Sequence, residues 1–327
     1  MNPTPTTSPP APGRGEAAAS DATPVISISP VVLAAPGRVA ALHLRISAPA
    51  TGQALPILLL SHGHGRSNNL ASLNGNAPLA NYWAAHGFVV IQPTHLDSKT
   101  LDLGPETPGW PLFWRSRVED MTHIIDQLAD LEASVPLLSG RLDHTRIAVA
   151  GISLGGHTAG MLLGAQLTDP ANGEVVTLAE PRIKAGVLLS APGAGGVALS
   201  AFATENFSFF RQPSFAEMTT PALVVMGDQD SSPHLTTRGA DWHADPYNLS
   251  PSPKCLVTVV GGEHLLGGIT GYDVAETTDE NPERVALVQQ LTWAYLRTTL
   301  YPEDSAWPVA CAALQDSPAP QGRVVCK

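Results

Sequence analysis

Three residues of this 327-residue chain have the types and the order that nucleophilic acyl transfer requires. A serine hydroxyl is a poor nucleophile until a base removes its proton. The reaction therefore needs an exposed serine, a histidine within reach and a carboxylate that fixes the histidine. Ser153, His264 and Asp230 are the candidates for these roles, in the chain order serine, acid, histidine. The pattern predicts chemistry in which a serine oxygen attacks an acyl carbon.

The serine lies in the segment GISLG, residues 151–155, which fits the pattern G-x-S-x-G. The apolar run 146–150 precedes it, and the segment 155–167, of helical length and rich in small residues, follows it. Glycines permit a strained turn and a close passage of helix against strand, and such a turn lifts the serine side chain above a sheet. We therefore expect Ser153 to be a nucleophile rather than a serine of an ordinary turn.

The acid and the base are expected in loops that follow two later apolar runs. One run leads into GDQD, which contains Asp228 and Asp230, and the next leads into GGEH, which ends in His264. Loops at the carboxyl ends of parallel strands form the active site in open sheets. We prefer Asp230 to Asp228, because the loop should run a few residues past the strand before the acid meets the histidine. His234, close to the acid loop, is the alternative base.

Acyl transfer also needs N–H donors for the negative oxygen of the tetrahedral intermediate. Leu154, the residue after the serine, is one expected backbone donor. The second is expected from His64, in the loop HGHG that follows the apolar run 56–61. His62 and His64 have no third or fourth ligand at a suitable spacing, so we predict no metal site there. The serine mechanism itself requires no cofactor, and we expect none.

Short apolar runs alternate with segments of helical period, which is typical of a mostly parallel sheet with helices on both faces. Ser116 to Glu119 has the capping-box form at the start of one predicted helix, which extends to residue 131. The expected strands are 40–47, 56–61, 88–92, 146–150, 185–189, 222–226 and 256–260, and the expected helices are 78–86, 116–131, 155–167 and one beginning at 281–282.

One α/β domain over residues 26–302 is the simplest organisation for a chain of this length. Residues 1–25 and 303–327 are rich in Pro, Ala, Thr or Ser, and we expect them to be tails. Residues 97–115 are expected to be a loop that contains Pro, Gly and Trp, and residues 191–217 lack clear periodicity. Each is expected either to form a lid or pocket wall or, for the five phenylalanines of 191–217, to pack on the main core.

The net charge of −11 is spread along the chain without a basic cluster, which argues against nucleic acid as a partner. No apolar run approaches the roughly 20 residues of a membrane-spanning helix, and the first residues lack the form of a secretory signal. We therefore expect a cytoplasmic protein. Cys255, Cys311 and Cys326 are expected either as three free thiols or with a bridge between Cys311 and Cys326.

The motifs SHGHG, PTHLDS, GISLGG, GDQD and GGEH occur in the order seen in α/β-hydrolases. Over about residues 30–300 the chain resembles the chlorophyllase-like and platelet-activating-factor-acetylhydrolase-like branch, near dienelactone hydrolases and cutinase-like polyester hydrolases. The resemblance implies an α/β-hydrolase fold, a triad of Ser153, Asp230 and His264, and an oxyanion hole at His64 and Leu154. Dienelactone hydrolases typically have a cysteine where this chain has Ser153.

These features predict a hydrolase of carboxylic esters, acting on a small-molecule or polymeric ester through an acyl-enzyme. Thioesters, lactones and amides are alternative substrates for the same triad, and a non-catalytic binding protein with a hydrolase-like fold is an alternative of another class. The sequence leaves the acyl group, the alcohol and the oligomeric state open.

Overall fold

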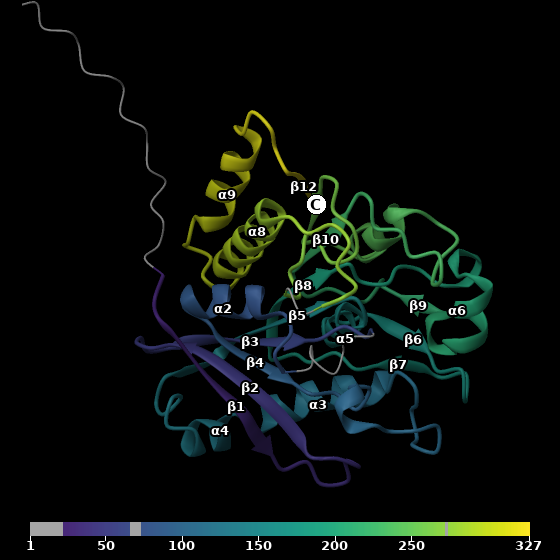
Figure 1. The fold of residues 1–327 in the computed structure, drawn as a ribbon, viewed down its shortest axis with the longest axis horizontal. Helices are drawn as coiled ribbons and strands as arrows, with labels where there is room; N and C mark the ends of the chain where they lie inside the picture. The colour runs from purple at the N-terminus through teal and green to yellow at the C-terminus, as the bar shows by residue number, and fades with distance from the viewer. Residues whose placement is uncertain (1–21, 66–72, 272–273) are drawn as a thin grey trace, which may run out of the picture.

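The computed structural model of the protein describes residues 22–65, 73–271 and 274–327. A central sheet contains nine strands in the order β1-β2-β4-β3-β5-β8-β10-β11-β12 (Figure 1). Its strands are β1 (Val25–Leu33), β2 (Leu42–Pro49), β3 (Leu55–Ser61), β4 (Val89–Pro93), β5 (Leu142–Ile152), β8 (Ile183–Leu189), β10 (Ala222–Gly227), β11 (Lys254–Val259) and β12 (Gly322–Cys326). The six strands from β4 to β11 in this order run parallel, whereas β1, β2 and β12 pair antiparallel at the two edges.

Helices cover both faces of this sheet. They are α2 (Ala77–Ala85), α3 (Trp114–Asp126), α4 (Leu128–Ser134), α5 (Leu154–Leu162), α6 (Ala201–Asn206), α7 (Asp245–Asn248), α8 (Pro282–Leu300) and α9 (Ala306–Gln315). Short 3-10 helices η1 to η4 span Lys99–Leu101, Gly196–Ala198, Ser208–Phe210 and Ala240–Ala244. A small antiparallel sheet joins β7 (Val175–Thr177), β6 (Gln166–Thr168) and β9 (Pro213–Ser214).

Alternate residues of the central strands point to opposite faces, and each face has its own apolar core. Leu58 and Leu60 of β3 pack in one cluster with side chains of α2, α8 and α9, whereas Ile57 and Leu59 pack in the other with those of α3, α4 and α5. Figure 1 shows α2, α8 and α9 on one side of the sheet and α3 and α4 on the other. The prediction of a mostly parallel sheet between two helical layers is confirmed. Strands buried on both faces explain why the parallel strands are continuous apolar runs.

The predicted helix start at Ser116 is wrong. Helix α3 begins at Trp114, after Phe113 with a left-handed φ of 48°, so Ser116 lies inside the first turn and caps nothing. The Arg117 amide donates to the Phe113 carbonyl oxygen at 3.0 Å. The predicted helix also divides near Gln127, where α3 ends and α4 begins. The capping-box pattern was present, but the boundary lies at Phe113, which the surrounding structure holds at a positive φ that bulky residues rarely adopt.

The prediction of a C-terminal tail over 303–327 is also wrong. Helix α9 packs on α8, and β12 pairs antiparallel with β11 at the edge of the sheet. Cys326 stands opposite Cys255 in this pairing, and the two form a disulfide. Both expectations, three free thiols and a bridge between Cys311 and Cys326, are therefore wrong, and only Cys311 of the three is free. The predicted N-terminal tail lies mostly outside the described residues, and β1 begins at Val25.

The segment 191–217, one of the two expected lid or pocket-wall segments, packs most of its phenylalanine side chains into the core. Phe209, Phe210 and Phe215 are buried in the core cluster that includes α3 and α5, whereas Phe202 is half-exposed. The core-packing interpretation therefore fits most of this segment. No helix among residues 22–65, 73–271 and 274–327 is long and apolar enough to cross a membrane. The cytoplasmic location stays a prediction, and a disulfide, which persists mainly in oxidising compartments, counts against it.

Candidate active site

Ser153 occupies a strained turn between β5 and α5. Its φ and ψ are 54° and −118°, a backbone conformation that residues other than glycine rarely adopt. The flanking glycines make the turn possible by close packing. A Cβ atom on Gly151 would lie 1.9 Å from the carbonyl oxygen of Gly155, and one on Gly155 would lie 2.1 Å from that of Ser61. The local sequence therefore fixes Ser153 directly after β5, at the carboxyl end of a central strand of the sheet.

The structure brings Ser153, His264 and Asp230 together. The Oγ atom of Ser153 lies 3.0 Å from Nε2 of His264, and Nδ1 of the same ring lies 3.1 and 3.0 Å from Oδ1 and Oδ2 of Asp230. A carboxylate can only accept, so Nδ1 carries a proton and Nε2 is left to accept the serine proton. His264 is partly exposed and Asp230 is fully buried. The order of contacts is the one that the sequence predicted.

The two alternative residues do not take these places. Asp228 turns back on the β11 loop, where its Oδ1 accepts from the Gly261 amide at 2.7 Å and its other oxygen lies 3.7 Å from Arg323. His264, and not His234, makes the bond to Ser153. Asp230 lies two residues further along the loop after β10, where it contacts His264 in the loop after the neighbouring parallel strand β11. This is the reach past the strand for which Asp230 was preferred to Asp228.

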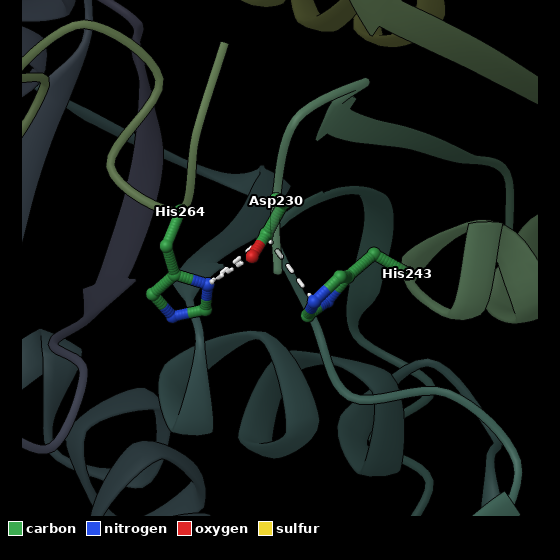
Figure 2. A group of neighbouring side chains, drawn as sticks. All are labelled: Asp230, His243 and His264. Atoms are coloured by element: carbon green, nitrogen blue, oxygen red, sulfur yellow. Dashed lines mark hydrogen bonds and ion pairs between the residues drawn. The ribbon is translucent and has the colours of Figure 1, made fainter. Parts of the chain in front are cut away.

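A second histidine, His243 of η4, reaches Asp230 from the opposite side, as Figure 2 shows. Its Nε2 atom lies 3.2 Å from Oδ2 of Asp230. Burial alone raises the pKa of Asp230, but contacts with His243 and His264 more than offset it and hold the pKa well below its ordinary value. His243 was not predicted as a site residue, because nothing in its spacing distinguishes it from other histidines of the chain.

Asp230, His243 and His264 are also the group of three, among the described residues, whose donor atoms lie close enough to hold a metal ion, all within 4.8 Å. The group offers three protein ligands, and one nitrogen of each histidine lies 3.0 to 3.2 Å from Oδ2 of Asp230. A metal on Nδ1 of His264 would displace the proton shared with Asp230. We therefore interpret the cluster as a series of hydrogen bonds and ion pairs.

A cavity of about 80 Å³ opens beside Ser153. Ser153, His264 and His64 line it together with the polar residues Asn76, Thr270 and Glu276, and Ile152 and Leu265 are among its apolar residues. A larger cavity of about 760 Å³, between α2 and the start of α8, shares Thr270 and Val274 with it. No described residue of 97–115 or 191–217 lines either cavity, so the structure does not support a lid or pocket wall from these segments.

The two residues predicted to supply oxyanion donors flank Ser153. Leu154 is the first residue of α5, so its N–H is one of the helical amides that lack an intrahelical acceptor. His64 lines the cavity together with Ser153, and the neighbouring Gly63 is packed so closely that an added Cβ would lie 3.4 Å from Cβ of Ser153. Their role as donors stays a prediction, since it depends on where a bound substrate would place its oxygen.

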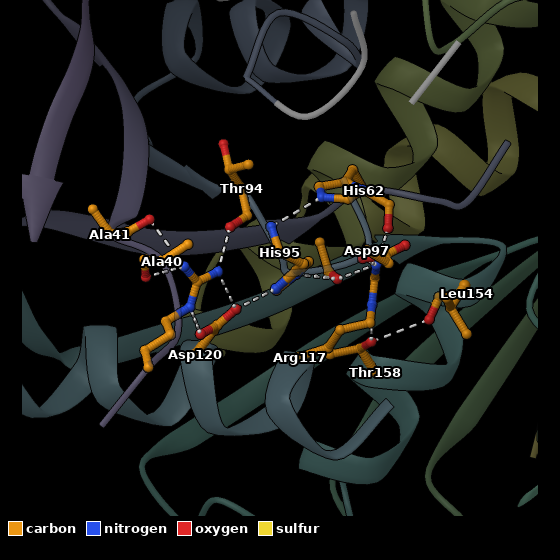
Figure 3. A network of polar contacts seen from close by, with 12 residues as sticks. Ala40, Ala41, His62, Thr94, His95, Asp97, Arg117, Asp120, Leu154 and Thr158 are labelled. Carbon is orange, nitrogen blue, oxygen red and sulfur yellow. Dashed lines mark hydrogen bonds and ion pairs between the residues drawn. The ribbon is translucent and has the colours of Figure 1, made fainter. Parts of the chain in front are cut away.

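A buried polar network supports the His64 loop (Figure 3). Arg117 of α3 is fully buried and contacts Oδ1 of Asp97 and the carbonyl oxygen of His62, and it donates to Thr158 of α5 at 3.1 Å. Asp97 in turn accepts from Nδ1 of His64 at 3.0 Å. One guanidinium therefore joins the loop after β3, the loop after β4 and helix α5. Neither Arg117 nor Asp97 was predicted as part of the site, because only the fold brings the two together.

The same network continues away from the cavity to Arg38. His95 lies 2.9 Å from both Oγ of Ser61 and Oδ2 of Asp120, and Arg38 donates to Asp120 at 2.8 Å. Burial and the nearby Arg117 hold the pKa of His95 well below its ordinary value. Burial raises the pKa of Asp120 to about 6, in spite of Arg38. A neutral His95 with its proton on Nδ1 satisfies both partners.

No protein-family model matches the chain, and no curated protein matches it either. The chemistry of the site is therefore judged from its own geometry. That geometry consists of the strained Ser153, the His264 ring at hydrogen-bond distance from its Oγ, and the buried Asp230 carboxylate on the other nitrogen of that ring.

Proposed function

We propose that the protein is a serine hydrolase that cleaves carboxylic esters through an acyl-enzyme. The observation that carries the proposal is the continuous series from Ser153 Oγ through the His264 ring to the buried carboxylate of Asp230, with each contact at 3.0 to 3.1 Å. A nucleophile, a base and a group that orients the base stand within hydrogen-bond reach, which is the arrangement that activates a serine.

In the proposed reaction His264 Nε2 takes the Ser153 proton while Oγ attacks the ester carbonyl carbon. The tetrahedral intermediate collapses, the alcohol leaves with the proton from His264, and the acyl group stays on Oγ. Water then attacks with His264 again as base, and the acid product leaves as Ser153 recovers its proton. Asp230 holds the ring with its proton on Nδ1 and stabilises the imidazolium. The backbone amides of Leu154 and His64 are the proposed donors to the intermediate's oxygen.

We further propose that the chain has the α/β-hydrolase fold. Support comes from the mostly parallel sheet with helices on both faces and from the strand, strained turn and helix around Ser153. The serine, acid and histidine follow strands β5, β10 and β11, so that the loops at one end of the sheet carry all three. The narrower resemblance to one branch of that superfamily stays a prediction.

The test compares Ser153→Ala with Ser139→Ala, a substitution of an exposed serine remote from the cavity. Turnover of a short-chain nitrophenyl ester should fall by at least about a thousandfold in Ser153→Ala, since the nucleophile is lost, and should be unchanged in Ser139→Ala. Labelling by a fluorophosphonate probe should vanish with the same selectivity. Undiminished turnover or labelling in Ser153→Ala would refute the proposal.

The same protein can be assayed on the alternative classes of substrate. Thioester, lactone and amide analogues of one acyl group should be compared at equal concentration, and the ratio of kcat/KM between them identifies the preferred bond. A binding protein without catalysis would give neither turnover nor labelling. The complete series of contacts at Ser153 favours catalysis over that alternative.

A further inference from the structure

Asp230 lies between two histidines, and only one of them has a part in the proposed reaction. His243 is 1% exposed, and its Nε2 lies 3.2 Å from the same Asp230 oxygen that His264 contacts at 3.0 Å. The two rings are 5.6 Å apart between centroids. Figure 2 shows the carboxylate placed between them. Apart from the histidines, Ser232 is the described donor to this carboxylate, at 3.3 Å.

The contacts of His243 determine where its protons are. Its Nδ1 lies 2.8 Å from the carbonyl oxygen of Ala191, which can only accept, so Nδ1 carries a proton. Nε2 is buried, has no hydrogen-bond partner and lies 3.2 Å from Oδ2 of Asp230, so in a neutral ring its lone pair would face the carboxylate oxygen across that distance. Turning the ring over would place carbon atoms against both oxygens. The imidazolium, with a proton on each nitrogen, keeps the hydrogen bond to Ala191 and turns the repulsive contact with Asp230 into an ion pair.

The other charged groups near His243 do not replace this cation. His234, on the loop that carries Asp230, is partly buried, and burial and the nearby His264 lower its pKa. On the segment of His243 itself, Asp245 and Arg238 pair with each other at 2.7 Å. Asp230 is therefore the anion that His243 faces, and His264 is the group on the other side of that anion.

We propose that His243 is a positioning residue that stays protonated, holds Asp230 as an ion and reduces how strongly Asp230 stabilises the imidazolium formed at His264. The inference rests on the proposed function for its consequence, since His264 must be the base. A carboxylate shared between two cations stabilises each of them less than it would one alone. The pair His243 and Asp230 therefore keeps His264 available as a base at lower pH than Asp230 alone would allow.

The first experiment measures the protonation state directly. Nitrogen-15 NMR of the full chain with labelled histidine, assigned by comparison with His243→Gln, should show two protonated ring nitrogens for His243 at pH 7 to 8. A single protonated nitrogen would overturn the inference. The spectrum should be the same with EDTA, and a change in the His243 signals on adding EDTA would instead assign the cluster to a metal ion. This measurement needs no turnover, so it stands even if the proposed function fails.

The second experiment measures the consequence in His243→Gln, where the amide keeps a donor but not the charge. The acid limb of its kcat/KM profile should move to higher pH by about one to two units, because unit charges at the observed 5.6 Å separation interact by about two pH units at an effective dielectric constant of about 20. His123→Gln, whose ring bonds the Ala34 carbonyl oxygen away from the cavity, is the control and should not move. A lower plateau with an unmoved acid limb would show a merely structural role and overturn the inference.

Discussion

Replacing Arg117 with methionine should destabilise the protein by about 3 to 5 kcal/mol, because it removes one partner of a fully buried ion pair. The methionine side chain fills part of the same space but leaves the Asp97 carboxylate, also fully buried, without its cation. The change also removes the donors to the His62 carbonyl oxygen and to Thr158. The assay is urea unfolding at pH 7.5, followed by the loss of native tryptophan fluorescence.

The sign of the pH dependence distinguishes this mechanism from a simple packing defect. In the native protein burial raises the pKa of Asp97, but Arg117 and His64 more than offset it, so the pKa lies well below its ordinary value. Without Arg117, burial should raise the folded-state pKa above the unfolded value of about 3.9. The folded variant then binds a proton that the unfolded chain does not. The difference in free energy of unfolding between the parent and the variant should therefore shrink as the pH falls through that raised pKa.

Two further variants complete the test. Adding Asp97→Asn to Arg117→Met should recover about 2 kcal/mol, since the two side chains are coupled and the unpaired charge is gone. Arg115→Met removes a neighbouring arginine whose pair with Asp169 is partly exposed to solvent, and should cost less than about 1 kcal/mol. The reasoning is refuted if Arg117→Met costs as little as the Arg115 control, or if its deficit grows as the pH falls.

Other predictions concern the pH dependence of stability, the turn glycine and the disulfide. Burial and Arg117 lower the pKa of His62 to about 4, so the unfolded chain gains a proton below about pH 6.5 that the folded state refuses. In urea titrations, His62 should lower the free energy of unfolding by about 3 kcal/mol between pH 6.5 and 4. Asp120, whose pKa is raised, should offset part of this loss. A rise in the free energy of unfolding over this range would contradict the prediction. Gly155→Ala places a Cβ 2.1 Å from a backbone carbonyl oxygen and should lower the free energy of unfolding by about 1 to 3 kcal/mol and abolish ester turnover. Gly160→Ala, where the added Cβ has contacts of 3.6 Å or more, should keep turnover. The double replacement of Cys255 and Cys326 by serine opens a link across 71 residues and should lower the free energy of unfolding by about 2 to 4 kcal/mol, and an unchanged urea midpoint would show that the link contributes nothing.

Local patterns in the sequence predicted much of the fold and of the candidate site. The continuous apolar runs predicted the parallel strands, because strands covered on both faces need no polar residues. The glycines around Ser153 predicted the strained turn, because their spacing is a requirement of local packing. The position of Asp230, two residues beyond Asp228, followed from the reach of a loop past its strand. All of these depend on residues that are neighbours in the chain.

The tertiary structure decided what depends on distant residues. The antiparallel pairing of β12 with β11 turned an apparent tail into an edge strand and joined Cys326 to Cys255 rather than to the nearer Cys311. Arg117 was part of a capping pattern in the sequence, yet the fold buries it against Asp97. His243 had no signal at all, since its contact with Asp230 exists only because η4 packs against the end of β10. The sequence by itself therefore determined which residues stand at the ends of strands, and the tertiary structure decided which charges are buried together.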